Sequence, residues 1–310
     1  MGNFCQNCKS NNIKFIYETY DYISQEKFQI NKCLNCHLLF PIEYPKDIDK
    51  YYPKKYRSYV PIVNKVINIK SKLYVKSVIK KFSRSSRNFK NKILEIGCGN
   101  GEMLKIFKDL DWEVFGSERT SIIQENNALN ISNKPINEYP NKYFDLILLY
   151  NSFEHLHDPK ETLKIITSKI KKNGLIVISV PSHDSYQSKF GKQDWLHLDA
   201  PRHLNIFSLA SFEHMIRDIE NISVLEIISH KSISFDLEFY GWFQTILNKF
   251  YTENNLFHKY LQNINKNKLN FYIGLMQLFI LSVPCAILGL YSMVVNKGAI
   301  TETVLKKKTD

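Results

Sequence analysis

Three glycines at alternate positions follow an apolar run, and an acid comes 21 positions after the first of them. The glycines are Gly97, Gly99 and Gly101, directly after Ile93–Ile96, and the acid is Glu118. Glycine lets backbone N–H groups approach a ligand closely at the positive end of the following helix. A carboxylate about 20 residues later is where a nucleotide-binding βαβ unit holds a ribose. The spacing therefore predicts a nucleotide site.

The position of the third glycine separates two kinds of cofactor. A dinucleotide site needs Gly-x-Gly-x-x-Gly or Ala, but the last place here is Glu102, and Gly101 comes one residue early. A dinucleotide oxidoreductase is therefore disfavoured. The pattern Glu-x-Gly-x-Gly-x-Gly, which begins at Glu95, resembles the first motif of class I methyltransferases that use S-adenosylmethionine (SAM). The alternative is a glycine-rich turn without a ligand, and the acid at Glu118 makes it the weaker interpretation.

Four cysteines near the start of the chain form two matching pairs. Cys5-x2-Cys8 and Cys33-x2-Cys36 are separated by 24 residues. Two such pairs supply four thiolates, the tetrahedral set that a structural Zn²⁺ prefers. Redox-active pairs are the alternative, but one catalytic pair would not need a second. The stretch Cys33–His37 also matches a haem attachment motif. Haem attachment would require export and would leave the first pair unexplained, so we reject it.

Strand and helix patterns alternate regularly from about residue 90. The predicted fold is α/β, with a Rossmann-like seven-stranded class I methyltransferase sheet, a small N-terminal zinc ribbon of four cysteines, and an apolar helical insertion before the last strand. Residues 61–82 show helical spacing with interleaved lysines; we prefer a helix covering the sheet to a basic helix for membrane or RNA. The predicted domains are a zinc ribbon (1–40), a linker with the covering helix (41–90), the SAM-binding core (91–235), the apolar insertion (236–296), and the last strand and tail (297–310).

Four further segments extend the resemblance over about residues 90–230. They are Phe144–Ile147, Asn151–Pro159, Lys172–Pro181 and Trp195–Ser208. They resemble small-molecule methyltransferases, including the ubiquinone-type O-methyltransferases and the group found with bacterial surface-polysaccharide genes. A zinc knuckle ahead of such a domain also resembles sugar C-methyltransferases, whose long C-terminal domain is missing here. The resemblance implies methyl transfer to a small-molecule, sugar or lipid-linked acceptor, for instance in cell-surface polysaccharide synthesis.

The same resemblance assigns roles to single residues. The glycine loop borders SAM, Glu95 orders its amino-acid end, and Glu118 takes the ribose hydroxyls. Asn137 flanks the adenine and Asn151 faces the methionine part. The residues expected to bind the cofactor are thus Glu95, Gly97, Cys98, Gly99, Gly101, Glu118, Asn137 and Asn151.

A hydroxyl acceptor must lose a proton, and histidine is the natural base near neutral pH. We favour His155 and His203, because both fall in loops expected at the carboxyl edge of the sheet, where ligands bind. A structural role for either histidine is the alternative. The ubiquinone-type relatives hold a divalent metal at this stretch. Asn151 stands where their first acid would be, so we predict no catalytic metal.

An apolar segment near the end of the chain departs from a minimal methyltransferase. The segment 271–295 has no charged residue over 25 positions. As one helix it would be ~37 Å long, enough to span a bilayer core of about 30 Å. However, Gly298–Lys306 reads as the last strand of the sheet, so the chain must return to the side it left. Pro284 would permit a bent or re-entrant pair of short helices, and we expect monotopic membrane insertion. The alternative is an apolar lid, or helices packed on the core or on a second subunit.

Composition gives weaker indications of partners. Lys and Arg number 42 against 30 Asp and Glu, for a net charge of +12. This charge favours anionic partners, but it is spread along the chain, and we do not expect nucleic acid. The first ten residues are polar and hold two cysteines, so we expect a cytoplasmic protein, peripheral or monotopic at the membrane. The alternatives are an RNA methyltransferase and a non-catalytic partner subunit with a SAM fold. The acceptor and the oligomeric state are not predicted.

Overall fold

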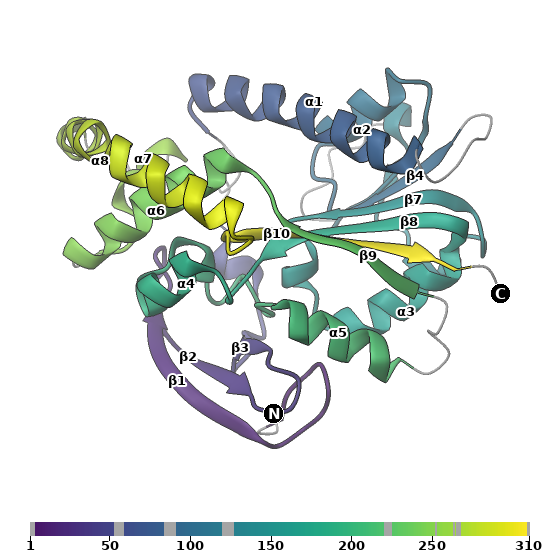
Figure 1. Ribbon diagram of the computed structural model, residues 1–310, viewed down its shortest axis with the longest axis horizontal. Helices are drawn as coiled ribbons and strands as arrows, with labels where there is room; N and C mark the ends of the chain where they lie inside the picture. Colours follow the sequence, from purple (N-terminus) through teal and green to yellow (C-terminus); the bar gives the residue numbers. More distant parts are fainter. Residues whose placement is uncertain are drawn as a thin grey trace. The chain divides into compact units, whose positions relative to one another are not determined.

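The chain forms two compact units (Figure 1). The first unit comprises Met1–Val63, Pro181–His214 and Lys231–Thr301, and the second comprises Asn64–Val180, Met215–His230 and Glu302–Asp310. This computed structural model describes residues 4–52, 59–83, 91–119, 127–219, 225–251, 253–262, 264 and 268–308.

A seven-stranded sheet has the order β6-β5-β4-β7-β8-β10-β9, which confirms the predicted fold class. The neighbours from β6 to β8 are parallel, so their carboxyl ends meet at one edge. The chain reverses its direction of winding beside β4, which makes this edge the expected ligand crevice. The strands are β4 (Lys92–Ile96), β5 (Glu113–Ser117), β6 (Ile131–Ser132), β7 (Phe144–Tyr150), β8 (Ile170–Pro181), β9 (Leu225–Ser232) and β10 (Ile300–Lys307).

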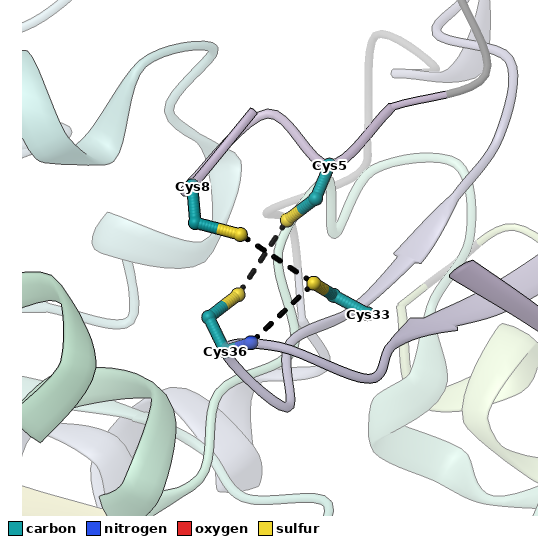
Figure 2. Close-up of side chains that lie close together, drawn as sticks. All are labelled: Cys5, Cys8, Cys33 and Cys36. Atoms are coloured by element: carbon teal, nitrogen blue, oxygen red, sulfur yellow. Dashed lines mark hydrogen bonds between the residues drawn. The ribbon is translucent and has the colours of Figure 1, made fainter. Parts of the chain in front are cut away.

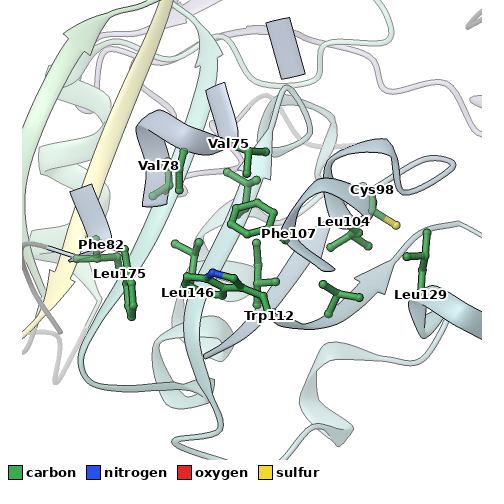
Figure 3. Close-up of a cluster of buried hydrophobic side chains, with 14 of the residues drawn as sticks. Val75, Val78, Phe82, Cys98, Leu104, Phe107, Trp112, Leu129, Leu146 and Leu175 are labelled. Carbon is green, nitrogen blue, oxygen red and sulfur yellow. The ribbon is translucent and has the colours of Figure 1, made fainter. Parts of the chain in front are cut away.

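Helices cover both faces of this sheet in the second unit. Figure 1 shows α1 (Pro61–Ser83) and α2 (Glu102–Lys108) on one face and α3 (Pro159–Lys169) on the other. The carboxyl half of α1 contributes buried side chains to the core, as we expected of a covering helix. Figure 3 shows the core beneath α1 and α2, which includes Val75, Val78, Phe82, Cys98, Leu104, Phe107, Trp112, Leu129, Leu146 and Leu175. This packing fixes the amino end of α2 against the sheet.

The first unit holds a small antiparallel sheet and the remaining helices. The small sheet contains β1 (Ile13–Tyr20), β2 (Lys27–Cys33) and β3 (Leu39–Pro41). The helices are α4 (Tyr186–Gly191), α6 (Phe235–Phe250), α7 (Leu256–Leu261) and α8 (Lys268–Val294), while α5 (Leu209–Asp218) runs from this unit into the second. Short 3-10 helices are η1 (Asp49–Tyr51), η2 (Asn127–Leu129), η3 (Ile136–Glu138), η4 (Phe153–His155), η5 (Lys192–Asp194) and η6 (Leu196–Leu198).

A fully buried arginine links the small sheet to a later loop of the first unit. Nη2 of Arg202 lies 2.7 Å from Oδ1 of Asp21, at the end of β1, and 2.6 Å from Oδ1 of Asp199. Nη1 donates to the carbonyl of Tyr51 at 3.0 Å, and the guanidinium lies 4.6 Å from the centre of the Tyr22 ring. Two carboxylates and a carbonyl offset the desolvation of the buried charge. The loop at 199–203 is therefore held firmly against β1.

Helix α8 is a single helix that continues through Pro284, so the predicted pair of short helices is wrong. Proline removes one backbone donor but does not end a helix whose other contacts hold it in place. By length and composition alone, Leu269–Val294 is the one helix among the described residues that could cross a membrane. Only 17% of its most apolar stretch is buried, which distinguishes it from the core helix of a globular protein.

A buried acid in α6 should make stability depend on pH. The carboxylate of Glu238 accepts hydrogen bonds from Nε2 of Gln187 at 2.9 Å and from the backbone N–H of Ala299. Burial raises the pKa of Glu238 from 4.5 to about 7. Between these values the folded chain holds a proton that the unfolded chain has released, so stability is full below pH 4.5 and falls as the pH rises to about 7. We expect Glu238→Gln to flatten this fall, as measured by urea unfolding at several pH values. An unchanged slope in the variant would contradict the assignment.

Candidate functional site

The glycine loop between β4 and α2 has a backbone that only glycine adopts readily. Gly97, Gly99 and Gly101 have φ values of +76°, +54° and +73°. A Cβ atom at Gly97 would lie 2.5 Å from Cβ of Ser152, and one at Gly101 would lie 2.7 Å from Cδ1 of Ile131. A side chain at Gly97 or Gly101 would thus be strained by the left-handed backbone and would also overlap its neighbours, so only glycine fits these two positions.

Glu118 connects the loop to the neighbouring strand. Its Oε2 accepts the N–H of Gly99 at 2.7 Å, and its Oε1 accepts the N–H of Arg119 at 2.9 Å. The carbonyl of Ser117 accepts the N–H of Gly97 at 2.8 Å. Glu118 as a whole residue is 8% exposed, so it lies at the sheet edge beside the loop rather than in open solvent. The structure therefore brings together the loop and the acid that the spacing predicted.

The end of β7 forms the other side of the loop. Asn151 has a φ of +48°, and its N–H donates to the carbonyl of Ser179 at 2.9 Å. Among the described residues, its Oδ1 is a buried atom without a hydrogen-bond partner. Oγ of Ser152 donates to the carbonyl of Ile96 at 2.7 Å and so ties β7 to the end of β4. The sequence analysis missed this role of Ser152; its only signal was a small hydroxyl residue directly after a buried strand.

Two other predicted residues lie close by with different surroundings. Glu95 is the penultimate residue of β4, pairs with Gly116 and Leu148, and is 3% exposed. The side chain of Cys98 belongs to the apolar core, where a Cβ at Gly116 would lie 2.7 Å from its Sγ (Figure 3). Any contact of Cys98 with a cofactor in the loop must therefore be made by its backbone.

The structure places Asn137 away from the glycine loop. Its carbonyl accepts a hydrogen bond from Nζ of Lys169 at 2.9 Å. Lys169 ends α3 directly before β8 begins, and β8 pairs its first residue with Phe144 at the start of β7. Asn137 thus lies toward the amino edge of the sheet, whereas the glycine loop lies at the carboxyl edge. This position gives no support to the predicted contact of Asn137 with an adenine.

These features fit a nucleoside cofactor bearing an amino acid. The glycine loop brings its backbone to the carboxyl edge of the sheet, Glu118 is an acid beside it, and among the described residues Asn151 presents a buried amide oxygen without a hydrogen-bond partner. An amide oxygen accepts hydrogen bonds, which suits an ammonium group, and a carboxylate suits vicinal hydroxyls. The fit rests on residues of the second unit alone.

The backbone conformation of the loop leads to a stability prediction. Gly97→Ala should lower the free energy of unfolding by about 2 kcal/mol or more, because a side chain is strained at this φ and would overlap Ser152. Gly289→Ala in α8 is the matched control, since its Cβ would find ordinary contacts of 3.4 Å with residues of α6. Chemical unfolding measures both variants. Equal stability of the two would contradict the left-handed loop.

The two predicted bases belong to different units. His155 ends η4, five residues after β7, and is half-buried in the second unit; its backbone N–H donates to the carbonyl of Ser152 at 3.2 Å. His203 is buried in the first unit, and its Nδ1 lies 2.9 Å from the carbonyl of His197, which makes Nδ1 the protonated nitrogen. Burial is the main cause that lowers the pKa of His203, so its ring is neutral at pH 7. A role in catalysis stays a prediction for both.

The four N-terminal cysteines converge in the first unit. Figure 2 shows their sulfurs facing one another. Sγ of Cys5 lies 3.5 Å from that of Cys36, Sγ of Cys8 lies 3.5 Å from that of Cys33, and all four lie within 4.8 Å of one another. Tetrahedral zinc with Zn–S bonds of 2.3 Å requires sulfurs about 3.8 Å apart. The donor set and its spacing fit one zinc ion.

The protonation of these thiols reflects their crowding. A hydrogen bond from the Cys5 thiol is the main cause that lowers the pKa of Cys36 to about 5, and the same bond raises the pKa of Cys5 far above its usual range. Burial raises the pKa of Cys33 to about 11. Four thiolates this close repel one another, so only a bound cation could keep all of them deprotonated. The backbone N–H of Cys36 also donates to Sγ of Cys33 at 3.4 Å, which orients that sulfur.

One protein-family match overlaps most of the second unit. Residues 69–220 match the family described as "Methyltransferase domain". No curated protein sequence matches the chain.

Two solved structures share the fold at low sequence identity. The plantazolicin methyltransferase, solved with SAH, is 18% identical with a TM-score of 0.51, and the match covers 85% of this chain and 92% of that one. A protein from Galdieria sulphuraria, assigned as a sarcosine dimethylglycine methyltransferase, is 11% identical with a TM-score of 0.52, covering 84% of this chain and 98% of that one.

Proposed function

We propose that this protein, which contains a class I SAM-dependent methyltransferase domain at residues 69–220, transfers a methyl group to a small-molecule, sugar or lipid-linked acceptor. The observation that carries the proposal is the bond of 2.7 Å between Glu118 and the N–H of Gly99. It places an acid at the rim of a left-handed glycine loop, as a nucleoside cofactor requires. A cell-surface glycan intermediate is the acceptor class that the sequence resemblance favours.

Each part of the site has a task in this reaction. Bound SAM supplies an electrophilic methyl group on a sulfonium. Glu118 holds the ribose hydroxyls, the backbone of the glycine loop borders the cofactor, Asn151 orients the amino-acid end, and the buried core beneath the loop keeps these groups in place. Most of the rate gain in such a displacement comes from aligning donor and acceptor and from excluding water.

A hydroxyl acceptor would pass its proton to a histidine. We propose His155 first, because it lies in the second unit and follows the same strand end as Asn151. His203 is the second candidate, because its neutral ring can accept a proton at Nε2. If one of them is the base, its replacement by asparagine removes the rise of the transfer rate with pH but leaves SAM binding unchanged.

We also propose that Cys5, Cys8, Cys33 and Cys36 hold one structural zinc ion. Their mutual distances and the N–H of Cys36 directed at Sγ of Cys33 support this role. The ion would cross-link the segment before β1 to the turn after β2, in a small sheet too thin to build a core of its own.

Incubation with radiolabelled methyl-SAM tests the reaction. The purified chain is given separate pools of nucleotide sugars, membrane lipid extract and total RNA, and the label transferred to each pool is counted. The proposal expects label in a sugar or lipid product, with a gain of one methylene. Label in RNA, with binding that weakens steeply as salt rises, would instead show an RNA methyltransferase. SAM binding without transfer to any pool would favour the non-catalytic partner.

A further inference from the structure

One half of helix α8 is apolar and faces solvent along its whole length. At 100° per residue, its exposed apolar side chains cover an arc of about 160°. Phe279 and Val294 are each 83% exposed, and α8 carries no charged residue after Lys268. The exposed side chains, here called the α8 apolar face, are those of Leu269, Tyr272, Ile273, Leu275, Met276, Phe279, Ile280, Val283, Ile287, Leu290, Tyr291 and Val294.

The opposite half of α8 packs inside the first unit. Gly274 contacts the ring of Phe257 so closely that a Cβ would lie 2.3 Å from it, and Cys285 is fully buried. Oγ of Ser292 accepts the indole N–H of Trp242 in α6 at 3.2 Å. The helix is thus a fixed surface element, and its apolar face cannot turn inward.

This packing decides how α8 could meet a membrane. If α8 spanned the membrane, it would draw α6 into the hydrocarbon. The buried polar network of α6 would be drawn in with it. In that network Asn248 bonds Gln244 at 2.8 Å and the carbonyl of Asp194 at 2.9 Å. The segment after α8 also stays within the unit, because the carbonyl of Ala299 accepts the N–H of Ser182 at 2.7 Å. Only an orientation in the plane of the bilayer exposes the apolar face to lipid and leaves these contacts intact.

The shape and the charge of this face select a bilayer over a second copy of the chain. A coiled-coil seam uses two positions in seven, a stripe much narrower than about 160°. The sequence between Glu253 and Glu302 contains four lysines and no acid, which complements anionic headgroups. Tyrosines suit the boundary between lipid and water, and Tyr272 and Tyr291 lie toward the two ends of the face. The ring of Tyr291 stacks on the ring of Tyr186, and the centre of the Tyr186 ring lies 5.9 Å from Nζ of Lys189. A lysine therefore lies near the Tyr291 end of the apolar face.

We infer that the α8 apolar face inserts, parallel to the membrane, into a lipid surface with anionic headgroups. Burial of a helix face to ~5–10 Å, at the boundary of headgroups and acyl chains, is typical of such monotopic contacts. The contact itself does not require methyl transfer. Its consequence, that the acceptor is presented at a membrane surface, rests on the proposed function.

Vesicle flotation tests the inference with the full chain. We expect the wild type to float with vesicles of phosphatidylcholine and phosphatidylglycerol, and less with phosphatidylcholine alone. Phe279→Asp and Val283→Asp should each lower partitioning about tenfold or more, because a carboxylate would enter the apolar layer. Phe15→Asp is the matched control: it changes a side chain 51% exposed in β1 of the same unit and should float like the wild type. Thermal unfolding should be unchanged in the variants, whose side chains are exposed.

Two results would overturn the inference. One is a wild type that stays at the bottom of the gradient with both vesicle types. The other is a chain that is dimeric without vesicles and becomes monomeric on Phe279→Asp while never floating, which would assign the face to a second copy. Calorimetry with SAM on the same preparations reports the second unit separately, so failure of the membrane contact and failure of the proposed function give different results.

Discussion

Replacing Glu118 by alanine is expected to weaken SAM binding by about a hundredfold and to abolish measurable methyl transfer. The carboxylate accepts the N–H of Gly99 at 2.7 Å and would accept the ribose hydroxyls as well. Its removal leaves a loop N–H without its acceptor and takes the charge from the rim of the site. Calorimetry measures the affinity, and label transfer measures the activity.

Glu113→Gln is the matched control for this prediction. Glu113 lies at the other end of the same strand, half-buried, with Oε2 3.4 Å from Nζ of Lys92. Its replacement should leave SAM affinity within about twofold of the wild type, because the change is confined to the amino edge of the sheet. Equal losses in the two variants would show a general defect in folding rather than a role of Glu118 at the site.

Removal of one cysteine ligand is the second change with a large expected effect. Cys36→Ser should abolish zinc binding and lower the free energy of unfolding of the first unit by about 3 kcal/mol or more. The physical reason is that the small sheet of β1, β2 and β3 depends on the cross-link between its two cysteine pairs. Elemental analysis should find one zinc ion per wild-type chain, and thermal unfolding should report the loss.

Cys285→Ala provides the control, since this thiol is also fully buried but lies in α8, outside the cluster. We expect it to retain one zinc ion per chain. A strong chelator should destabilise the wild type and the Cys285→Ala variant alike, and should have little further effect on Cys36→Ser. Purified wild-type protein that holds no metal, and whose four cysteines form disulfides, would contradict the zinc centre.

The sheet and the acid beside the glycine loop were predictable because both depend on local geometry. Strands β4 and β5 are parallel neighbours that pair Ile96 with Ser117, so residues just beyond these ends must meet. Glu118 directly follows Ser117 and Gly99 follows Ile96 by three residues, so the strand register and the turn of the glycine loop together bring them into contact. The cysteine pairs were predictable for a similar reason, since one short spacing precedes β1 and the other lies at the end of its neighbour β2, which brings four thiols together.

Other features depend on packing between distant segments. The path from β6 to β7 is set by the Tyr139 ring, which packs on Phe115 and Phe144 with centres 6.2 and 5.3 Å apart. Those contacts carry Asn137 away from the loop, and nothing in the local sequence signals them. Helix α8 likewise continues past Pro284 because α6 and α7 support it. Arg202 could not be predicted as a buried residue, because its partner Asp21 is remote in the sequence.

The most direct test of the account is calorimetry of the purified wild-type chain with SAM and, separately, with a nicotinamide dinucleotide. We expect heat of binding with SAM at one site per chain, its loss in Glu118→Ala, and no heat with the dinucleotide. Binding of the dinucleotide without binding of SAM would contradict the assignment of the glycine loop and Glu118 to a methyl donor.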